Sequence, residues 1–396
     1  MTKKILPDLT QWFGFHSKEY TVDPENPEIM SFNKDFANDL VRRSEQFIIS
    51  ETAPKFVLLE LSGDGKTHAM NYALNQLQKR DLIEKIYFIC PSMTRGSRYA
   101  VLHASIISHM HEKNLVLPIF KKLFQECTEK DPELWIKRLK DRIGYENIAK
   151  AVFNHFSENA TETQFFEYIS GNKIDKSTRA KLDVLDALNV EGAIRILEII
   201  SKFYYETTNK MITVVIDECD ELKSVRQYVR EYKEAFRRMA ELSHLGLVII
   251  FNVATRDDMK FDTLPTGLKD PGVVSRIGSA NYMFKPKPMH PDHVKPLILE
   301  INKSMRGEKF PDAFKKAKKQ NSKLEEASYP FSPEAIDEIV LKINNFYAKV
   351  KGEYLLPRDV INFAKDCITD AALDGKLFVD KKVVEKKQYN QKRTTL

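Results

Sequence analysis

The apolar residues of the chain fall into short unbroken runs that are separated by longer stretches with helical periodicity. The runs are 56–61 (FVLLEL), 86–90, 212–216 and 247–251, and none contains more than one polar residue. After the first run, residues 69–77 carry apolar side chains at helical spacing. Near-continuous apolar strands that alternate with helices are typical of a parallel sheet covered by helices on both faces. The pattern therefore predicts an α/β fold.

About a hundred residues separate the second and third runs, far more than one crossover helix needs. Four amphipathic helical patterns lie in this interval, at 101–114, 132–143, 146–156 and 191–206. No internal repeat is visible among them. The interval at about 103–208 therefore predicts a large helical insertion in the sheet domain.

The last hundred residues predict a separate all-helical domain. Four prolines between 286 and 296 mark a hinge after the last strand. Helical patterns follow at 332–347, 356–373 and 381–386, and Ser332 and Pro333 suit the cap and first residue of a helix. We expect an N-terminal segment at 1–50, a nucleotide-binding core at 51–285, a helical lid at 286–390 and a basic tail end at 391–396.

Composition limits the class of protein. The chain has 396 residues, of which 42% are hydrophobic and 30% charged, so it is long enough and apolar enough to bury a core. No run reaches the about 18–20 apolar residues of a membrane span, and the N-terminus lacks the apolar stretch of a signal peptide. We expect a soluble, cytoplasmic protein with no membrane partner.

Cysteines and net charge change this picture little. The four cysteines are far apart and show no metal-binding spacing, so buried free thiols are expected. The net charge is +6, and residues 381–396, with six basic residues and one acidic residue, hold +5 of it. Such a tail is either a solvated end or an arm that binds nucleic acid.

The stretch SGDGKTH at 62–68 resembles a Walker A loop, G-x-x-x-x-G-K-[ST], with one departure. Glu60 stands where the first glycine is expected, at the strand end and away from the phosphates. The groups that would bind phosphate are present and lie between a predicted strand and a predicted helix, which argues against a chance match. The residues predicted to bind ATP here are Ser62, Gly63, Asp64, Gly65, Lys66, Thr67 and His68.

A second nucleotide motif, VVIDECDEL at 214–222, follows the third apolar run. Asp217 would hold Mg²⁺ through water, together with Thr67 of the Walker A loop, and Glu218 would deprotonate the attacking water. The alternative is an acidic pair that begins a surface helix. Asp220 and Glu221 are interpreted as helix-start charges.

Three further polar residues follow in an order that suits a nucleotide site. The fourth run ends in Asn252, which can hold the attacking water or can be an ordinary loop asparagine. Arg276 precedes an expected edge strand, and Arg358 lies at the start of an expected helix in the terminal domain.

These residues in this order resemble the AAA+ ATPases, which are P-loop NTPases, over about 32–384. The resemblance is to Walker A at 62–67, Walker B at 214–218, sensor 1 at Asn252, an arginine finger at Arg276 and sensor 2 at Arg358. Within that superfamily the chain looks most like the origin-recognition initiators and related transposition and phage-defence ATPases of the BREX type. We expect no winged-helix domain after the lid, and in this the chain would depart from the initiators.

The resemblance implies roles for these residues. Lys66, Thr67, Asp217 and Glu218 would act on ATP and Mg²⁺ in their own subunit, whereas Arg276 would act on a neighbour's ATP. Self-association through the ATP site and a protein partner are therefore expected, and DNA is a possible partner. Phe32 and Phe36 would approach the adenine base, with core packing as the alternative.

Three functions follow from this reading. The first is an oligomeric, ATP-hydrolysing switch that loads or regulates partners on DNA. The second is a signalling or defence NTPase that acts through protein partners without DNA. The third is a nucleotide-binding scaffold without turnover.

Overall fold

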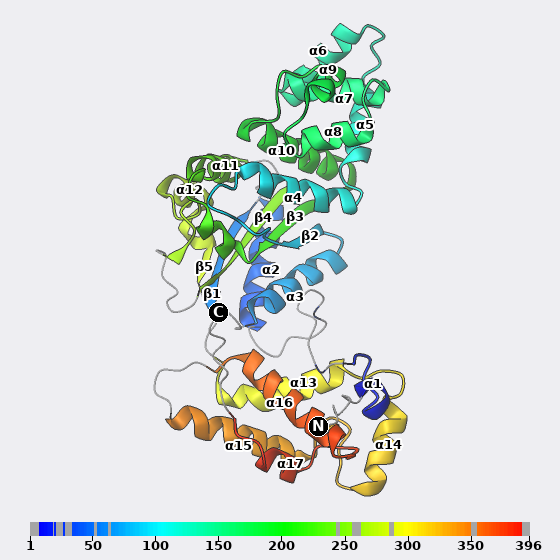
Figure 1. Ribbon diagram of the computed structural model, residues 1–396, viewed down its shortest axis with the longest axis vertical. Coiled ribbons are helices and arrows are strands. Elements are labelled where there is room, and N and C mark those ends of the chain that lie inside the picture. Colours follow the sequence, from blue (N-terminus) through cyan, green and yellow to red (C-terminus); the bar gives the residue numbers. More distant parts are fainter. Residues whose placement is uncertain are drawn as a thin grey trace. The chain divides into compact units, whose positions relative to one another are not determined.

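The structure, a computed structural model, describes residues 8–18, 20, 27, 34–50, 54–61, 65–242, 246–255, 263–284, 289–349 and 355–389. The chain forms two compact units (Figure 1). The helical unit comprises Met1–Leu40, Gly63–Asn75 and Pro286–Leu396, and the sheet unit comprises Val41–Ser62 and Gln76–Lys285. Helices α2 (Lys34–Ile49) and α3 (Lys66–Lys79) have residues in both units.

The sheet unit is built on five parallel strands in the order β2-β3-β4-β1-β5. They are β1 (Lys55–Leu61), β2 (Ile83–Ile89), β3 (Met211–Asp217), β4 (Leu247–Thr255) and β5 (Tyr282–Phe284). Every residue of β3 is buried, as expected for a strand covered on both faces. The four strands predicted from apolar runs and the edge strand expected after Arg276 are all present, which confirms the α/β fold.

Seven helices lie between β2 and β3 and form the predicted insertion. They are α4 (Tyr99–Glu112), α5 (Leu117–Glu126), α6 (Pro132–Ile143), α7 (Glu146–Phe156), α8 (Glu162–Ile169), α9 (Lys176–Leu182) and α10 (Val190–Thr208). The Asn189 side chain accepts a 2.8 Å hydrogen bond from the Gly192 amide and caps α10. Because α10 packs on β3 and β4, it fastens the insertion to the sheet.

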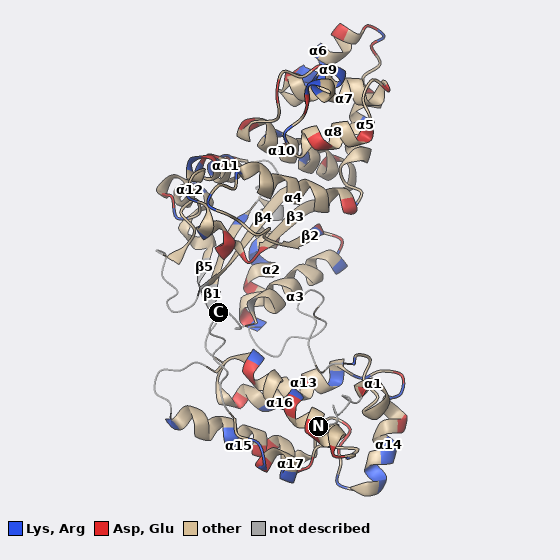
Figure 2. Cartoon of the chain, in the orientation of Figure 1, with Lys and Arg blue, Asp and Glu red and all other residues tan. Residues whose placement is uncertain are grey.

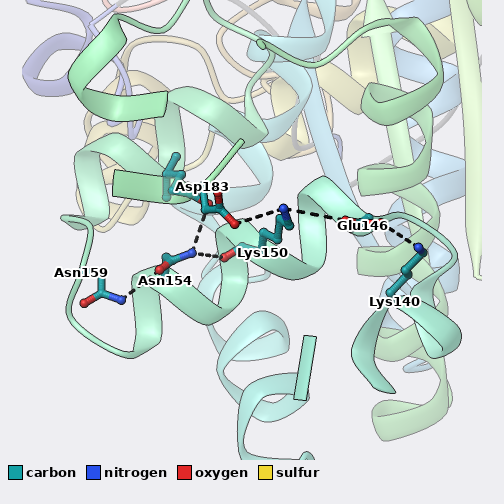
Figure 3. A network of polar contacts seen from close by, with 7 residues as sticks. Lys140, Glu146, Lys150, Asn154, Asn159 and Asp183 are labelled. Atoms are coloured by element: carbon teal, nitrogen blue, oxygen red, sulfur yellow. Dashed lines mark hydrogen bonds and ion pairs between the residues drawn. The ribbon is translucent and has the colours of Figure 1, made fainter. Parts of the chain in front are cut away.

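A polar network joins three parts of this insertion (Figure 3). The Glu146 carboxylate lies 2.7 Å from the Lys140 ammonium and 3.7 Å from the Lys150 ammonium. Lys150 in turn lies 3.0 Å from Asp183, after α9, and the Asn154 amide donates to the Leu182 carbonyl at 3.2 Å. These groups are half-buried or exposed, so they orient α6, α7 and α9 and contribute little stability.

The remaining elements of the sheet unit follow β3 and β4. They are the 3-10 helix η1 (Cys219–Ser224), α11 (Val229–Glu241), α12 (Pro271–Ile277) and the 3-10 helix η3 (Ser279–Asn281). The Asp270 side chain caps α12 by accepting from the Gly272 amide at 3.0 Å. α12 packs on α11, so the segment before edge strand β5 is held against the body of the unit.

The helical unit has its own apolar core. Its elements are α1 (Leu9–Trp12), η4 (Pro291–His293), α13 (Val294–Ser304), α14 (Phe310–Gln320), α15 (Pro333–Lys349), α16 (Pro357–Leu373) and α17 (Lys381–Glu385). The Ser332 hydroxyl accepts from the Ala335 amide at 3.2 Å, which confirms the predicted cap. The three predicted helices are α15, α16 and α17, whereas α13 and α14 were not predicted.

The described N-terminal residues pack into this helical core. Phe13 lies edge-on to Tyr329, with ring centroids 6.3 Å apart, and the Tyr20 hydroxyl donates to Asn302 Oδ1 at 2.8 Å. Phe32 lies outside the described residues, and Phe36 is half-buried on α2. An approach of this segment to the adenine base stays a prediction. Among the described helices, none is both long and apolar enough to span a membrane.

Candidate functional site

Asp217 is the most constrained polar residue at the carboxyl edge of the sheet. It ends β3, and its side chain is only 6% exposed. Its Oδ1 accepts hydrogen bonds from Asn252 Nδ2 at 2.6 Å and from the Glu218 amide at 2.8 Å. Its Oδ2 accepts from the Tyr87 hydroxyl at 2.8 Å. Donors from two neighbouring strands and from the following residue thus fix the orientation of this carboxylate.

Glu218 holds an unusual backbone conformation for a residue with a side chain. Its φ is +54° and its ψ is +38°, in the left-handed region, and its side chain is exposed. Such a conformation costs of order 1–3 kcal/mol and persists only where the surrounding structure holds it. Here it ends β3 and starts η1, so the exposed glutamate directly follows the buried aspartate.

The next two acidic residues hold the surrounding loops. They lie in the first turn of η1, as predicted. Asp220 Oδ1 accepts a long 3.4 Å hydrogen bond from the Ala254 amide of β4, and Glu221 Oε2 accepts from the Met93 amide at 3.2 Å. These side chains connect η1 to β4 and to the loop after β2.

Asn252 lies inside β4, which corrects the expectation that the strand ends there. β4 continues for three residues to Thr255, because its backbone pairs with β1 through Leu61. The Asn252 side chain is fully buried and contacts Asp217. The sequence analysis therefore placed Asn252 correctly in the strand next to Asp217, but it ended that strand three residues too early.

Tyr87 is a site residue that the sequence analysis missed. It lies in β2, where it is the Cα partner of Val215, and its hydroxyl contacts Asp217. The contact depends on β2 being the neighbour of β3. One signal was available, since a tyrosine with a polar hydroxyl stands inside an otherwise apolar run.

The Walker A segment is described from Gly65 onward, and Ser62, Gly63 and Asp64 lie outside the described residues. Gly65 has φ +79°, a conformation that favours glycine, and α3 begins at Lys66. The side chain of Lys66 also lies outside the description, whereas Thr67 and His68 are half-buried in the first turn of α3. The predicted strand, loop and helix order is present.

The helical unit brings Gly65 close to the start of α16. A Cβ atom built on Gly65 would lie 4.0 Å from Pro357 Cγ. The next residue, Arg358, is exposed in the first turn of α16. Gly65 and Pro357 are therefore neighbours in the fold, although about 290 residues separate them in the chain.

Arg276 lies in the last turn of α12 and is already engaged within its own chain. Its Nε lies 2.5 Å from Glu241 Oε1 on α11, and its Nη1 donates to the Gly272 carbonyl at 2.8 Å. Its side chain is 38% exposed. The arginine is thus held at the surface by contacts that another anion could replace.

The cysteines are free, as expected, although Cys127 is only partly buried. Burial raises the pKa of the Cys219 thiol, and its hydrogen bond with the Cys90 thiol raises it further. A protonated, buried thiol is a poor nucleophile. Within the described ranges, no group of three His, Cys, Asp or Glu side chains could hold a metal.

Neither a protein-family model nor a curated protein sequence matches the chain. Solved structures do match. The ORC2 protein of Aeropyrum pernix in its ADPNP-ADP complexes has a TM-score of 0.53 at 12% identity, over 94% of this chain and 71% of that one. The ADP form of the same protein has a TM-score of 0.51 at 13% identity, over 91% and 69%.

These similarities establish the fold. The chain has an α/β fold of the P-loop NTPase type, as the ORC2 structures do, with a helical C-terminal region. At this level of sequence identity the similarity shows the fold only. The activity has to be argued from the residues of the site.

Proposed function

We propose that the protein is an ATP-binding and hydrolysing AAA+ switch that self-associates through its nucleotide site and loads or regulates partners on DNA. The observation that carries the proposal is the buried, three-fold hydrogen-bonded Asp217 next to the strained, exposed Glu218. Asp217 ends β3 and Glu218 directly follows it, and β1, which leads into the Walker A sequence, ends at the same edge of the sheet.

The residues suit a complex of ATP and Mg²⁺. Bound Mg²⁺ would neutralise phosphate charge and position the terminal phosphate. Both Asp217 oxygens already accept hydrogen bonds, so this carboxylate suits a metal held through water better than one held directly. Thr67 in the first turn of α3 offers a hydroxyl ligand, and the start of α3 favours phosphate.

The side chains of the site would each have a separate role in binding and hydrolysing ATP. Lys66 would neutralise the terminal phosphates, and Arg358, beside the Pro357 that faces Gly65, would report their presence to the helical unit. Glu218 would accept the proton of the attacking water, and Asn252 would hold Asp217 and that water in line. The ADPNP and ADP complexes of the similar ORC2 structures support nucleotide binding by this chain.

The biological setting that we propose is that of origin-recognition initiators and the related transposition and antiviral-defence (BREX-type) ATPases. The seven-helix insertion before Asp217 supports the defence relation, because the resemblance extends into that segment.

ATP binding and turnover of two variants test the proposal. Lys66→Ala should abolish ATP binding in calorimetry, because the charge facing the phosphates is lost. Glu218→Gln should keep ATP binding and lose hydrolysis, because the amide cannot accept a proton. Lys79→Ala, at the other end of α3, is the matched control and should change neither. Unchanged ATP affinity in Lys66→Ala, or wild-type turnover in Glu218→Gln, would refute the assignment.

A further inference from the structure

One short segment of the helical unit carries as much net charge as the whole protein. Residues 303–323 contain eight basic and two acidic residues, a net charge of +6, and the net charge of the chain is also +6. The segment covers the end of α13, all of α14 and the residues that follow. The charge is therefore concentrated in one short stretch of the sequence.

The basic residues of α14 lie on one side of the helix. Phe310, Ala313 and Ala317 are buried in the core of the unit. With 3.6 residues per turn, the opposite side carries four exposed lysines, Lys315, Lys316, Lys318 and Lys319. We name these four residues the α14 lysine face. Figure 2 shows the basic colour in the C-terminal half of α14.

No carboxylate in the described part of the chain lies within 4 Å of the ammonium groups of this face. Other cations of the same unit are paired, for example Arg306 with Glu326 at 2.9 Å and Lys295 with Asp337 at 2.8 Å. Like charges three and four positions apart destabilise a helix. The fold therefore keeps this positive charge without a carboxylate that neutralises it, although the Lys318 ammonium lies 5.4 Å from the centroid of the Phe314 ring.

We propose that the α14 lysine face binds the sugar-phosphate backbone of duplex DNA without reading its sequence. Lysine ammonium groups bind phosphate oxygens as point charges, and phosphate contacts set position without carrying base information. An acidic protein partner fits less well, because lysine is depleted in protein interfaces and this face exposes no large apolar anchor. The same lack of an apolar anchor argues against insertion into a membrane surface.

This inference deepens the DNA part of the proposed function, yet it uses no residue of the nucleotide site. Four phosphate contacts predict a slope of about −3.6 for the logarithm of affinity against the logarithm of salt concentration. Over about 50 to 200 mM salt, that slope corresponds to a loss of about 10²-fold in affinity. Both quantities can be measured by fluorescence anisotropy with a labelled DNA duplex.

The test compares two variants that lose the same charge. The first replaces Lys315, Lys316, Lys318 and Lys319 by Gln. The control replaces Lys121, Lys130, Lys137 and Lys173 of the insertion, which are likewise exposed and, in the described structure, not ion-paired. At about 200 mM salt the first variant should lose at least about 10²-fold in DNA affinity, and it should lose most of the salt slope. The control should bind as the wild type does, and circular dichroism should show both variants folded.

Three outcomes would overturn the inference. Equal losses in both variants would show that total charge alone drives binding. Unchanged binding in the α14 variant would place the DNA contact elsewhere. Loss of binding to phosphatidylserine vesicles with DNA binding intact would assign the face to a membrane.

One further measurement distinguishes a failure of this inference from a failure of the proposed function. Lys66→Ala should keep DNA binding that depends on the α14 lysine face. If the wild type shows no ATP turnover while the α14 variant still loses DNA affinity, the proposed ATPase fails and the DNA surface stands. If turnover is normal and the α14 variant binds DNA as the wild type does, the inference about the face fails alone.

Discussion

The Tyr87 hydroxyl donates a 2.8 Å hydrogen bond to Oδ2 of Asp217, from the strand next to the one that Asp217 ends. Asn252 holds the other carboxylate oxygen from the opposite neighbouring strand. Asp217 is therefore oriented from both sides, and a change in either donor should move the carboxylate without removing it.

Tyr87→Phe should lower ATP turnover by about 10-fold and raise the Mg²⁺ concentration for half-maximal turnover. The reason is that one charge-assisted hydrogen bond contributes about 1.5–3 kcal/mol, and 1.4 kcal/mol is a factor of ten in rate. Turnover against Mg²⁺ concentration measures both effects. Tyr282→Phe is the control, because it removes a buried 2.8 Å bond to the Leu268 carbonyl instead. Equal effects in the two variants would mean a general loss of packing.

Glu60→Gly tests whether the departure from the Walker A pattern weakens ATP binding. Glu60 lies within β1, paired with Ala254 of β4, so it serves as a strand residue in the structure. Glycine there should leave ATP affinity within a few-fold and lower the free energy of unfolding by about 0.5–1 kcal/mol, through added backbone entropy. Calorimetry and urea unfolding measure the two quantities. A large gain in affinity would instead show that the glutamate impairs the loop.

Local pattern was sufficient to predict the strands because each is an apolar run with little polar interruption. Even so, β4 extends to Thr255 rather than stopping at 251, since its polar residues are held by pairing with β1. Helix α14 was missed because its many lysines obscure the apolar spacing of Phe310, Ala313 and Ala317. The end of β4 and the presence of this helix therefore depend on contacts between residues far apart in the sequence.

Only the part of the candidate site that local sequence pattern determines could be predicted. Asp217 and Asn252 stand at the ends of recognisable runs, and the structure brings them within 2.6 Å. The contact of Tyr87 depends on the strand order β2-β3-β4, which no local pattern encodes. The approach of Pro357 to Gly65 likewise joins segments far apart in sequence, so only the folded chain reveals it.

His103 gives a prediction for pH dependence. It is fully buried on α4, with Nε2 2.9 Å from the Ile169 carbonyl, and burial lowers its pKa to about 4. In the unfolded chain the pKa is about 6.5, so the unfolded state binds more protons between these values. Stability from this group is complete above about pH 6.5 and falls as the pH drops towards 4.

Urea unfolding at two pH values measures this effect. Between about pH 7 and 5 the wild type should lose about 2 kcal/mol more than His103→Gln, which cannot titrate there. His109→Gln, on the same helix, is the control and should follow the wild type. If wild type and His103→Gln lose stability in parallel, His103 does not control the acid response.

Arg276 offers a test of assembly. Its guanidinium contacts Glu241 and the Gly272 carbonyl at the surface of the sheet unit. Exposed ion pairs are weak, about 0–1 kcal/mol, so a neighbouring subunit's phosphate could take the place of Glu241. Assembly would then exchange one anion for another at the same arginine.

We therefore expect specific ATP turnover to rise with protein concentration, and Arg276→Ala to remove that rise while leaving ATP binding nearly intact. An arginine supplied by a neighbour accelerates phosphoryl transfer by about 10³–10⁵, so isolated subunits should be slow. Mixing Arg276→Ala with Lys66→Ala should restore part of the activity, because the first supplies a competent ATP site and the second the arginine. Glu241→Ala, which frees Arg276 but keeps its charge, should retain the concentration dependence. Turnover that is independent of concentration, with no recovery on mixing, would make the site self-contained and leave Arg276 as a structural partner of Glu241.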